Sequence, residues 1–392
     1  MSDAYVVSAV RTPVARAFKG GFRNFRPDDL LAHALKSALA EVPELDPARI
    51  EDVIVGCAMP EAEQGMNVAR IGVLLAGLPD NVPGVTVNRF CSSGLQTIAM
   101  AADRIRLGEA DVMIAAGTET MSMVPMMGHK VAMNPKAFTD ENVAIAYGMG
   151  ITAEKVAREW QVSRQDQDQF AYQSHQKAIA AIDGGEFTEI RPVTVTSRVP
   201  GPDGTIQVRE TVVDTDEGPR RDTTAEALSK LRTVFDAKGT VTAGTSSQMS
   251  DGAGALILVS ERVVKELNLK PLAVFRGFSV AGVRPEVMGI GPIEAIPKVC
   301  KQTGIAKDDL DWIELNEAFA AQALAVMRTV ELDPTKVNPL GGAIALGHPL
   351  GATGAILAAK LIHGLHRRQQ RYGMVTMCIG TGMGAAGIFE RL

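Results

Sequence analysis

Short apolar runs alternate with stretches of helical spacing along most of the chain. Residues 52–57, 111–117, 311–316 and 374–380 are mainly apolar, and polar or glycine-rich positions follow each run. Runs of this length and composition predict buried β-strands. Within residues 95–105, apolar side chains recur every three or four positions, which predicts a helix. Strands that alternate with helices predict an α/β fold whose sheets are covered by helices.

The same succession of strand and helix occurs twice in the chain. The strand at 52–57 corresponds to the one at 311–316, and a strand-to-helix junction at Cys91 corresponds to one at His348. Each pair is separated by about 260 residues, which indicates two copies of one α/β unit. If the copies pack with pseudo-twofold symmetry, the loops after matching strands converge on a single cleft.

The interval between the two copies has a different character. The pair Asp203-Gly204 predicts a hairpin turn, and the helix expected at 164–182 has Phe170, Gln173 and Ile179 among charges, so we expect it to be largely solvated. Such an insertion over a glycine-rich cleft is typical of a substrate-binding cap. Four methionines at its start fit either the cap or the core: Met121, Met123, Met126 and Met127. The predicted domains are 1–118 with 251–271, the insertion 119–250, and 272–392.

Composition narrows the class of protein. The 392 residues are 46% hydrophobic, so a large core is feasible, and the net charge of −5 gives no electrostatic footprint for nucleic acid. The four cysteines have no CxxC spacing, which favours a reducing compartment over disulfides. No charged and apolar leader opens the chain, and no apolar run approaches the length of a membrane span. We expect a cytoplasmic protein.

Cys91 is the first candidate for chemistry. It stands where the apolar run at 85–87 gives way to the helix at 95–105. A thiol at the positive end of a helix dipole is expected to favour the thiolate, which is the nucleophilic form. A cysteine taken alone is more often inert packing. Two distant segments change that reading.

The first of these segments surrounds His348. Residues 338–354 hold glycines and two prolines around this one histidine, so the backbone can turn tightly and approach a ligand. A helix of small residues follows. Because imidazole titrates near neutral pH, His348 is a candidate general base.

The second segment is the glycine-rich stretch after Cys378. Gly382, Gly384 and Gly387 formally match a dinucleotide-binding fingerprint, but that motif needs a helix, a strand and an acidic residue further on. Only a few residues remain before Leu392, so we reject the assignment of a dinucleotide-binding motif here. A glycine-rich turn beside a second cysteine instead suggests backbone N–H groups that stabilise an oxyanion.

Four motifs together resemble the thiolase family across the whole chain. They are Cys91 in NRFCSSGLQ, Asn316 in NEAFA, His348 in GGAIALGHPLGATG and Cys378 in CIGTGMGAAG. The resemblance implies duplicated βαβ halves, layered α-β-α-β-α, with an inserted loop domain that binds coenzyme A.

The resemblance also implies a role for each motif. Cys91 would attack the substrate and His348 would take its proton, while Cys378 would serve as the second acid and base. Asn316, through a held water, would bind the thioester oxygen together with His348. The N–H groups of Cys91 and Gly380 would bind the acyl-enzyme oxyanion. The activity implied is that of an acyltransferase that cleaves 3-ketoacyl-CoA.

Substrate contacts follow from the same resemblance. Arg220 and Ser247 match positions that hold the nucleotide and pantetheine parts of coenzyme A, and Met149 lies at the acyl site. Coenzyme A is a co-substrate, and no metal or further cofactor is expected. A homodimer or homotetramer is implied, and a hydratase or 3-hydroxyacyl-CoA dehydrogenase subunit is a conceivable partner.

Three alternatives remain open. The first is an acetyl-CoA acetyltransferase that forms acetoacetyl-CoA. Its relatives resemble Tyr-His-Met-Gly where this chain has Gly148 between Tyr147 and Met149. The absence of the histidine side chain leaves space that favours a degradative enzyme with longer substrates. A decarboxylating ketosynthase would carry a second histidine in place of Cys378. A lipid carrier of the same fold would tolerate loss of motifs that are intact here.

Overall fold

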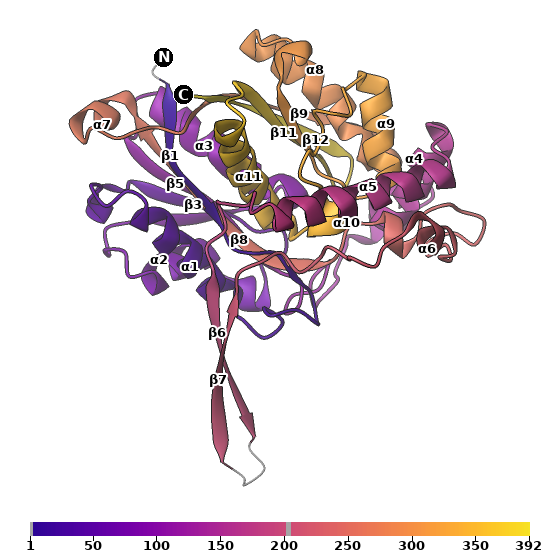
Figure 1. Cartoon of the computed structure of the whole chain (residues 1–392), viewed down its shortest axis with the longest axis horizontal. Helices are drawn as coiled ribbons and strands as arrows, with labels where there is room; N and C mark the ends of the chain where they lie inside the picture. The colour runs from indigo at the N-terminus through magenta and orange to yellow at the C-terminus, as the bar shows by residue number, and fades with distance from the viewer. Residues whose placement is uncertain (1–2, 201–204) are drawn as a thin grey trace.

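The computed structural model describes residues 3–200 and 205–392. Within them ten strands form one sheet in the order β10-β11-β12-β9-β1-β8-β5-β3-β4, with the short β2 paired to β8 (Figure 1). The strands of the first half are β1 (Ala4–Arg11), β2 (Ala15–Arg16), β3 (Asp52–Gly56), β4 (Gly84–Val87), β5 (Val112–Thr120) and β8 (Ser250–Ser260). Those of the second half are β9 (Ala273–Gly282), β10 (Trp312–Leu315), β11 (Tyr372–Ile379) and β12 (Met383–Arg391).

The two halves have the same topology, as the repeat predicted. In the first half β4, β3, β5, β8 and β1 are neighbours in that order. In the second half a parallel bridge between Val337 and Ile313 precedes β10, β11, β12 and β9. The halves join through β1 and β9, which pair antiparallel over a short stretch next to Tyr5 and Val274. The prediction of duplicated βαβ units is confirmed.

The helices complete five layers. α3 and α11 pack against each other between the two halves, α1 and α2 cover the outer face of the first half, and α8 and α9 cover that of the second (Figure 1). Every residue of β5 and β8 is buried, which explains the apolar runs at 112–116 in β5 and at 255–259 in β8. The helices are α1 (Pro27–Ala40), α2 (Val68–Leu75), α3 (Ser93–Arg106), α7 (Glu261–Glu266), α8 (Gly291–Thr303), α9 (Ala320–Val330), α10 (Ala343–Leu346) and α11 (Thr353–Arg367).

The two central helices begin very close to each other. A Cβ atom at Gly94 would lie 2.7 Å from the backbone nitrogen of Ala355, and one at Gly354 would lie 2.1 Å from that of Leu95. Only glycine permits this approach. The loops that precede α3 and α11, which carry Cys91 and His348, therefore meet at the centre of the molecule.

The insertion folds as helices and a projecting hairpin. β6 and β7 pair antiparallel from Val193 with Val213 to Pro200 with Ile206, and Figure 1 shows them extending away from the body. The hairpin is confirmed, while its predicted Asp203-Gly204 turn lies outside the described residues. The elements are α4 (Met149–Glu159), α5 (Arg164–Asp183), β6 (Val193–Pro200), β7 (Ile206–Val213) and α6 (Ala225–Ser229).

The prediction that α5 is largely solvated is wrong on one face. Ala171, Ser174, His175 and Ala178 are buried, and the helix packs against α9 and α10. Small side chains on that face allow close contact, whereas the exposed positions are mainly glutamines: Gln165, Gln169, Gln173 and Gln176. In the described part of the chain, no helix combines the length and apolar character needed to cross a membrane.

Candidate active site

Cys91 lies at the base of an apolar cavity. It belongs to a 3₁₀ turn, Phe90–Ser92, that links β4 to α3, and its side chain is buried. Phe90 has φ of +45°, a left-handed conformation that is strained for an aromatic residue. The Ser93 hydroxyl stabilises the turn: it donates to Phe90 O at 2.7 Å and accepts from Arg89 N at 2.9 Å.

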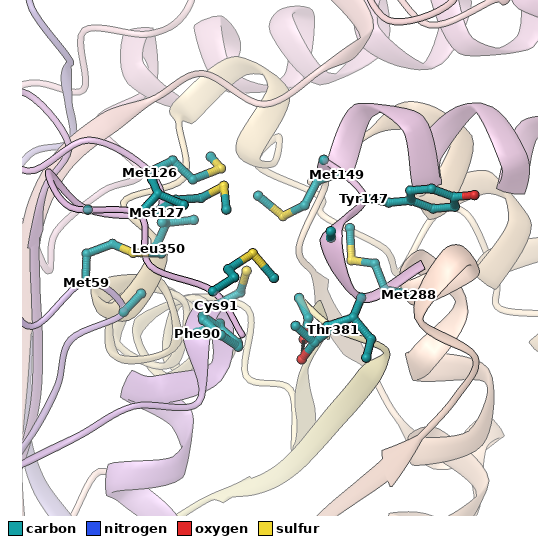
Figure 2. A pocket seen from close by; sticks show the side chains of 18 of the residues that line it. Met59, Phe90, Cys91, Met126, Met127, Tyr147, Met149, Met288, Leu350 and Thr381 are labelled. Atoms are coloured by element: carbon teal, nitrogen blue, oxygen red, sulfur yellow. Dashed lines mark hydrogen bonds between the residues drawn. The ribbon is translucent and has the colours of Figure 1, made fainter. Parts of the chain in front are cut away.

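The cavity has a volume of about 530 Å³ and opens above Cys91 (Figure 2). Thioether side chains from several segments surround the sulfur. Met126 and Met127 from the insertion are among them, whereas Met121 is buried in the core. Of the methionines at the start of the insertion, some therefore line the cavity and others fill the core. The labelled methionines that line the cavity are Met59, Met126, Met127, Met149 and Met288.

His348 lies next to Asn316. The Asn316 Nδ2 amide is 3.3 Å from Nε2 of His348, and Nδ1 of His348 is 2.7 Å from the Thr353 hydroxyl. The backbone N–H of His348 donates to Gln248 O and to Ser250 Oγ, each at 3.2 Å. This pattern favours the tautomer with its proton on Nδ1, which leaves Nε2 as the acceptor that a general base needs.

Cys378 and Gly380 lie close to Cys91. Cys378 is the penultimate residue of β11, and the N–H of Gly380, just beyond that strand, lies close enough to the Cys91 sulfur to lower its pKa. Gly380 lines the cavity with Thr381. The predicted glycine turn is shorter than expected, because Gly384 lies within β12, where a Cβ would clash with Gly291.

The four predicted motifs therefore converge. The 3₁₀ turn Leu350–Ala352, which follows His348, packs against the turn that carries Cys91, and β11 contacts that turn from the other side. Asn316 follows β10, and its backbone N–H donates to Thr376 O at 2.9 Å, which fixes it beside the strand of Cys378. The site is assembled from both halves of the duplicated fold.

Burial determines the protonation of this site. It raises the pKa of Cys91 to about 11, although the N–H groups of Gly380 and of Cys91 itself act in the opposite direction. It lowers the pKa of His348 to about 4. For Cys378, burial and the neighbouring Cys91 both raise the pKa. The expectation that the helix N-terminus holds Cys91 as a thiolate is wrong for the substrate-free protein, because desolvation outweighs the hydrogen bonds from these N–H groups.

The raised pKa of Cys91 predicts how its reactivity depends on pH. We expect alkylation of Cys91 by iodoacetamide, followed by peptide mapping without substrate, to accelerate about tenfold per pH unit above neutrality, since only the thiolate reacts. The rate should level off only near the pKa of about 11. A plateau near pH 8.5, as for an ordinary thiol at roughly that pKa, would contradict the effect of burial.

Of the three residues predicted to bind the substrate or coenzyme A, Arg220 and Ser247 do not line this cavity. Met149 lines it, at the start of α4. Arg220 is exposed, and its backbone N–H donates to His175 Nδ1 at 3.2 Å. Ser247 is half-buried and its N–H donates to Ala318 O at 2.9 Å, close in sequence to Asn316.

Several residues of the site were missed by sequence reasoning. Thr353 falls within the quoted histidine motif, five residues after His348, and this short separation was an available signal. Ser250, which accepts from the backbone of His348, and Glu119, which accepts from that of Gly351, had no signal in the sequence, because these contacts depend on tertiary packing. Across residues 3–200 and 205–392, no group of three or more histidine, cysteine or carboxylate side chains is arranged to hold a metal ion.

Comparison with known proteins places the chain in a family. Residues 4–262 match the thiolase N-terminal domain and residues 269–391 match the thiolase C-terminal domain. The chain is 52% identical over 391 residues to the 3-ketoacyl-CoA thiolase of Bacillus subtilis (strain 168), covering 100% of both. It is 45% identical to the peroxisomal 3-ketoacyl-CoA thiolase 5 of Arabidopsis thaliana, covering 99% of this chain and 85% of that one.

Solved structures agree with this placement. The acetyl-CoA acetyltransferase of Bacillus anthracis superimposes with a TM-score of 0.90 at 37% identity, covering 100% of this chain and 99% of that one. Human mitochondrial 3-ketoacyl-CoA thiolase gives a TM-score of 0.88 at 38% identity with the same coverage. The chain belongs to the thiolase family.

Proposed function

We propose that the protein is a 3-ketoacyl-CoA thiolase of fatty-acid β-oxidation. It cleaves a 3-ketoacyl-CoA with coenzyme A into acetyl-CoA and an acyl-CoA shortened by two carbons. The observation that carries this proposal is the buried thiol of Cys91, at the base of an apolar cavity and close to the second thiol of Cys378, in a turn that packs against the loop following His348. Full-length relatives with that name support it.

In the first half-reaction Cys91 attacks C3 of the substrate. The reaction needs a soft nucleophile that is afterwards a good leaving group, and a thiolate is both. Since thiol and imidazole are both neutral near pH 7, the proton passes to Nε2 of His348 as the S–C bond forms. The N–H groups of Cys91 and Gly380 bind the oxyanion that develops on C3.

Collapse of this intermediate breaks the C2–C3 bond and leaves an enolate of acetyl-CoA. Cys378 donates its proton to C2. Its raised pKa suits the task, because a weakly acidic thiol is protonated at neutral pH and matches a strongly basic carbon. Asn316, through a held water, and His348 bind the enolate oxygen, and their hydrogen bond orients both groups.

The second half-reaction balances the protons. Cys378, now a thiolate, takes the proton of the incoming coenzyme A, whose sulfur attacks the acyl group on Cys91. The C–S bond to Cys91 breaks, and His348 returns the stored proton to that sulfur. Arg220 and Ser247 are proposed to hold coenzyme A, which is the co-substrate, and the cycle requires no other cofactor.

Gly148 sets the expected chain length. It lines the cavity, its φ is −61°, and among the described residues nothing lies within 4 Å of a Cβ built there. One buried methylene contributes about 0.8 kcal/mol, so two extra carbons should raise kcat/KM by roughly tenfold until the pocket ends. We therefore expect 3-ketohexanoyl-CoA or a longer substrate to surpass acetoacetyl-CoA in steady-state thiolysis with substrates of four to sixteen carbons.

The variant Gly148→His should shift this preference back toward four carbons, because it fills open space without backbone strain. Gly148→Ala is the matched control, since it restricts the backbone equally but adds no imidazole. The structural likeness to an acetyl-CoA acetyltransferase makes acetoacetyl-CoA formation the second candidate function. That candidate replaces the first if acetoacetyl-CoA is already the best substrate of the unmodified protein.

Assembly and location complete the proposal. We place the protein in the cytoplasm, supported by four free cysteines and by bacterial relatives, although two plant relatives are named peroxisomal. A homodimer or homotetramer is proposed, with a hydratase or 3-hydroxyacyl-CoA dehydrogenase subunit as a further partner. Light scattering of the purified chain, alone and mixed with such a subunit, tests both.

A further inference from the structure

Glu119 is a fully buried carboxylate behind the wall of the cavity. It lies near the end of β5, and its Oε2 accepts from the backbone N–H of Ala58 at 2.7 Å and of Gly351 at 2.9 Å. Its Oε1 accepts from Met59 N at 3.3 Å and from the Gln64 amide at 2.6 Å. In the described residues no lysine, arginine or histidine forms an ion pair with it.

These partners require the ionised form. Each of them is an N–H donor, and the Cys57 thiol, with Sγ 3.8 Å from Oε1, is placed to donate as well. A protonated carboxyl group would direct its hydrogen at another donor and leave it unsatisfied. Desolvation raises the pKa of Glu119, and the hydrogen bonds from Ala58, Gly351, Gln64 and Met59 oppose that rise. The site therefore contains a buried anion without a cation.

The anion joins loops from the two halves of the fold. Ala58 and Met59 line the cavity, and so does Leu350, the neighbour of Gly351. These loops are so closely packed that a Cβ on Gly351 would lie 2.6 Å from Ala58 N, which is a steric clash. Displacing Glu119 would thus move two walls of the cavity and the loop that carries His348.

We propose that Glu119 is a positioning residue: it holds the loops at Ala58 and Gly351 together beside the turn that carries Cys91. The proposal rests on the function given above, because it assumes that Cys91 is the nucleophile. It adds a residue that touches neither the acyl chain nor the reacting atoms.

The charge of Glu119 supplies a readout that a purely structural role would not change, because it acts on Cys91 together with a small set of other groups. Cys378 approaches from β11, His348 from the loop before α11, Glu61 from the rim of the cavity and Arg89 from the preceding turn. Glu119 is the carboxylate whose charge raises the pKa of Cys91. Replacing it with a neutral amide of the same shape should therefore ease thiolate formation.

Two variants and a control separate charge from position. Glu119→Gln removes the charge and places an amide against N–H donors, whereas Glu119→Asp keeps the charge but shortens the reach. Glu154→Gln is the control: Glu154 is also a buried carboxylate that accepts from backbone N–H groups, those of Thr240 and Val241, both at 2.8 Å. Unlike Glu119, it is not among the groups that shift the pKa of Cys91.

Three measurements on each full-length variant test the proposal. They are the pH profile of Cys91 alkylation without substrate, kcat and KM for 3-ketohexanoyl-CoA, and thermal unfolding. We expect Glu119→Gln to shift the alkylation profile to lower pH by about half a unit or more. Both Glu119 variants should lower kcat/KM by on the order of 100-fold, since small displacements in a site are costly. Glu119→Asp should keep the wild-type alkylation profile.

An unshifted profile in Glu119→Gln, with no greater loss of kcat/KM than in Glu154→Gln, would overturn the proposal. So would failure of both Glu119 variants to fold, because the residue would then be an architectural requirement. The alkylation arm needs no turnover. If the unmodified protein lacks thiolysis but the shift appears, the proposed function fails while the effect of the Glu119 charge stands.

Discussion

Replacing Cys91 with alanine is expected to abolish thiolysis and to leave the protein folded. Loss of a covalent nucleophile lowers kcat by on the order of 10⁴ to 10⁶, because no other group can form the acyl intermediate. The substitution removes one sulfur at the edge of an existing cavity, so it creates little new void. Steady-state thiolysis of 3-ketohexanoyl-CoA and a thermal unfolding scan measure the two effects.

The control for this variant is Cys300→Ala. Cys300 is a half-buried thiol of α8, away from the cavity, and its removal should leave kcat unchanged. Thiolysis by Cys91→Ala within tenfold of the unmodified rate would contradict the assignment of the nucleophile.

Replacing Cys378 with alanine should separate the two chemical roles. The variant still acylates at Cys91, but it should fail to exchange the α-proton of acetyl-CoA with solvent, because the group that transfers this proton is gone. Loss of a general acid and base lowers the rate by roughly 10² to 10⁴. Deuterium incorporation from D₂O into acetyl-CoA, followed by mass spectrometry, provides the measurement.

His348→Ala is the counterpart to that experiment. It should slow acylation of Cys91 itself, since His348 is the base proposed to receive the proton of the buried thiol. Unimpaired proton exchange in Cys378→Ala would rule out its acid and base role. Equal defects of both variants in acylation and in exchange would also contradict the division of labour.

The convergence of the site could be predicted because it depends on topology. Cys91 and His348 stand before matching helices of a duplicated unit, and matching loops meet when such units pack about a pseudo-twofold axis. The strand that ends at Cys378 could likewise be read from its apolar run. These features are local in sequence, and the symmetry connects them.

Features set by tertiary packing could not be predicted in this way. The local pattern placed Cys91 at a helix N-terminus and suggested a thiolate, but the burial that raises its pKa comes from segments far away in the chain. For the same reason the hydrogen bonds of Glu119 could not be predicted, since its partners Ala58 and Gly351 belong to different halves of the fold. The buried face of α5 was missed because alanine and serine give no apolar signal among charges.

The central claim is that Cys91 forms the acyl-enzyme in the cleavage of a 3-ketoacyl-CoA. The most direct test is incubation with 3-ketohexanoyl-CoA in the absence of free coenzyme A, followed by proteolysis and mass spectrometry. We expect release of acetyl-CoA and one butyryl group per chain on the peptide that contains Cys91. A butyryl group on Cys57, Cys300 or Cys378 in place of Cys91 would contradict the claim.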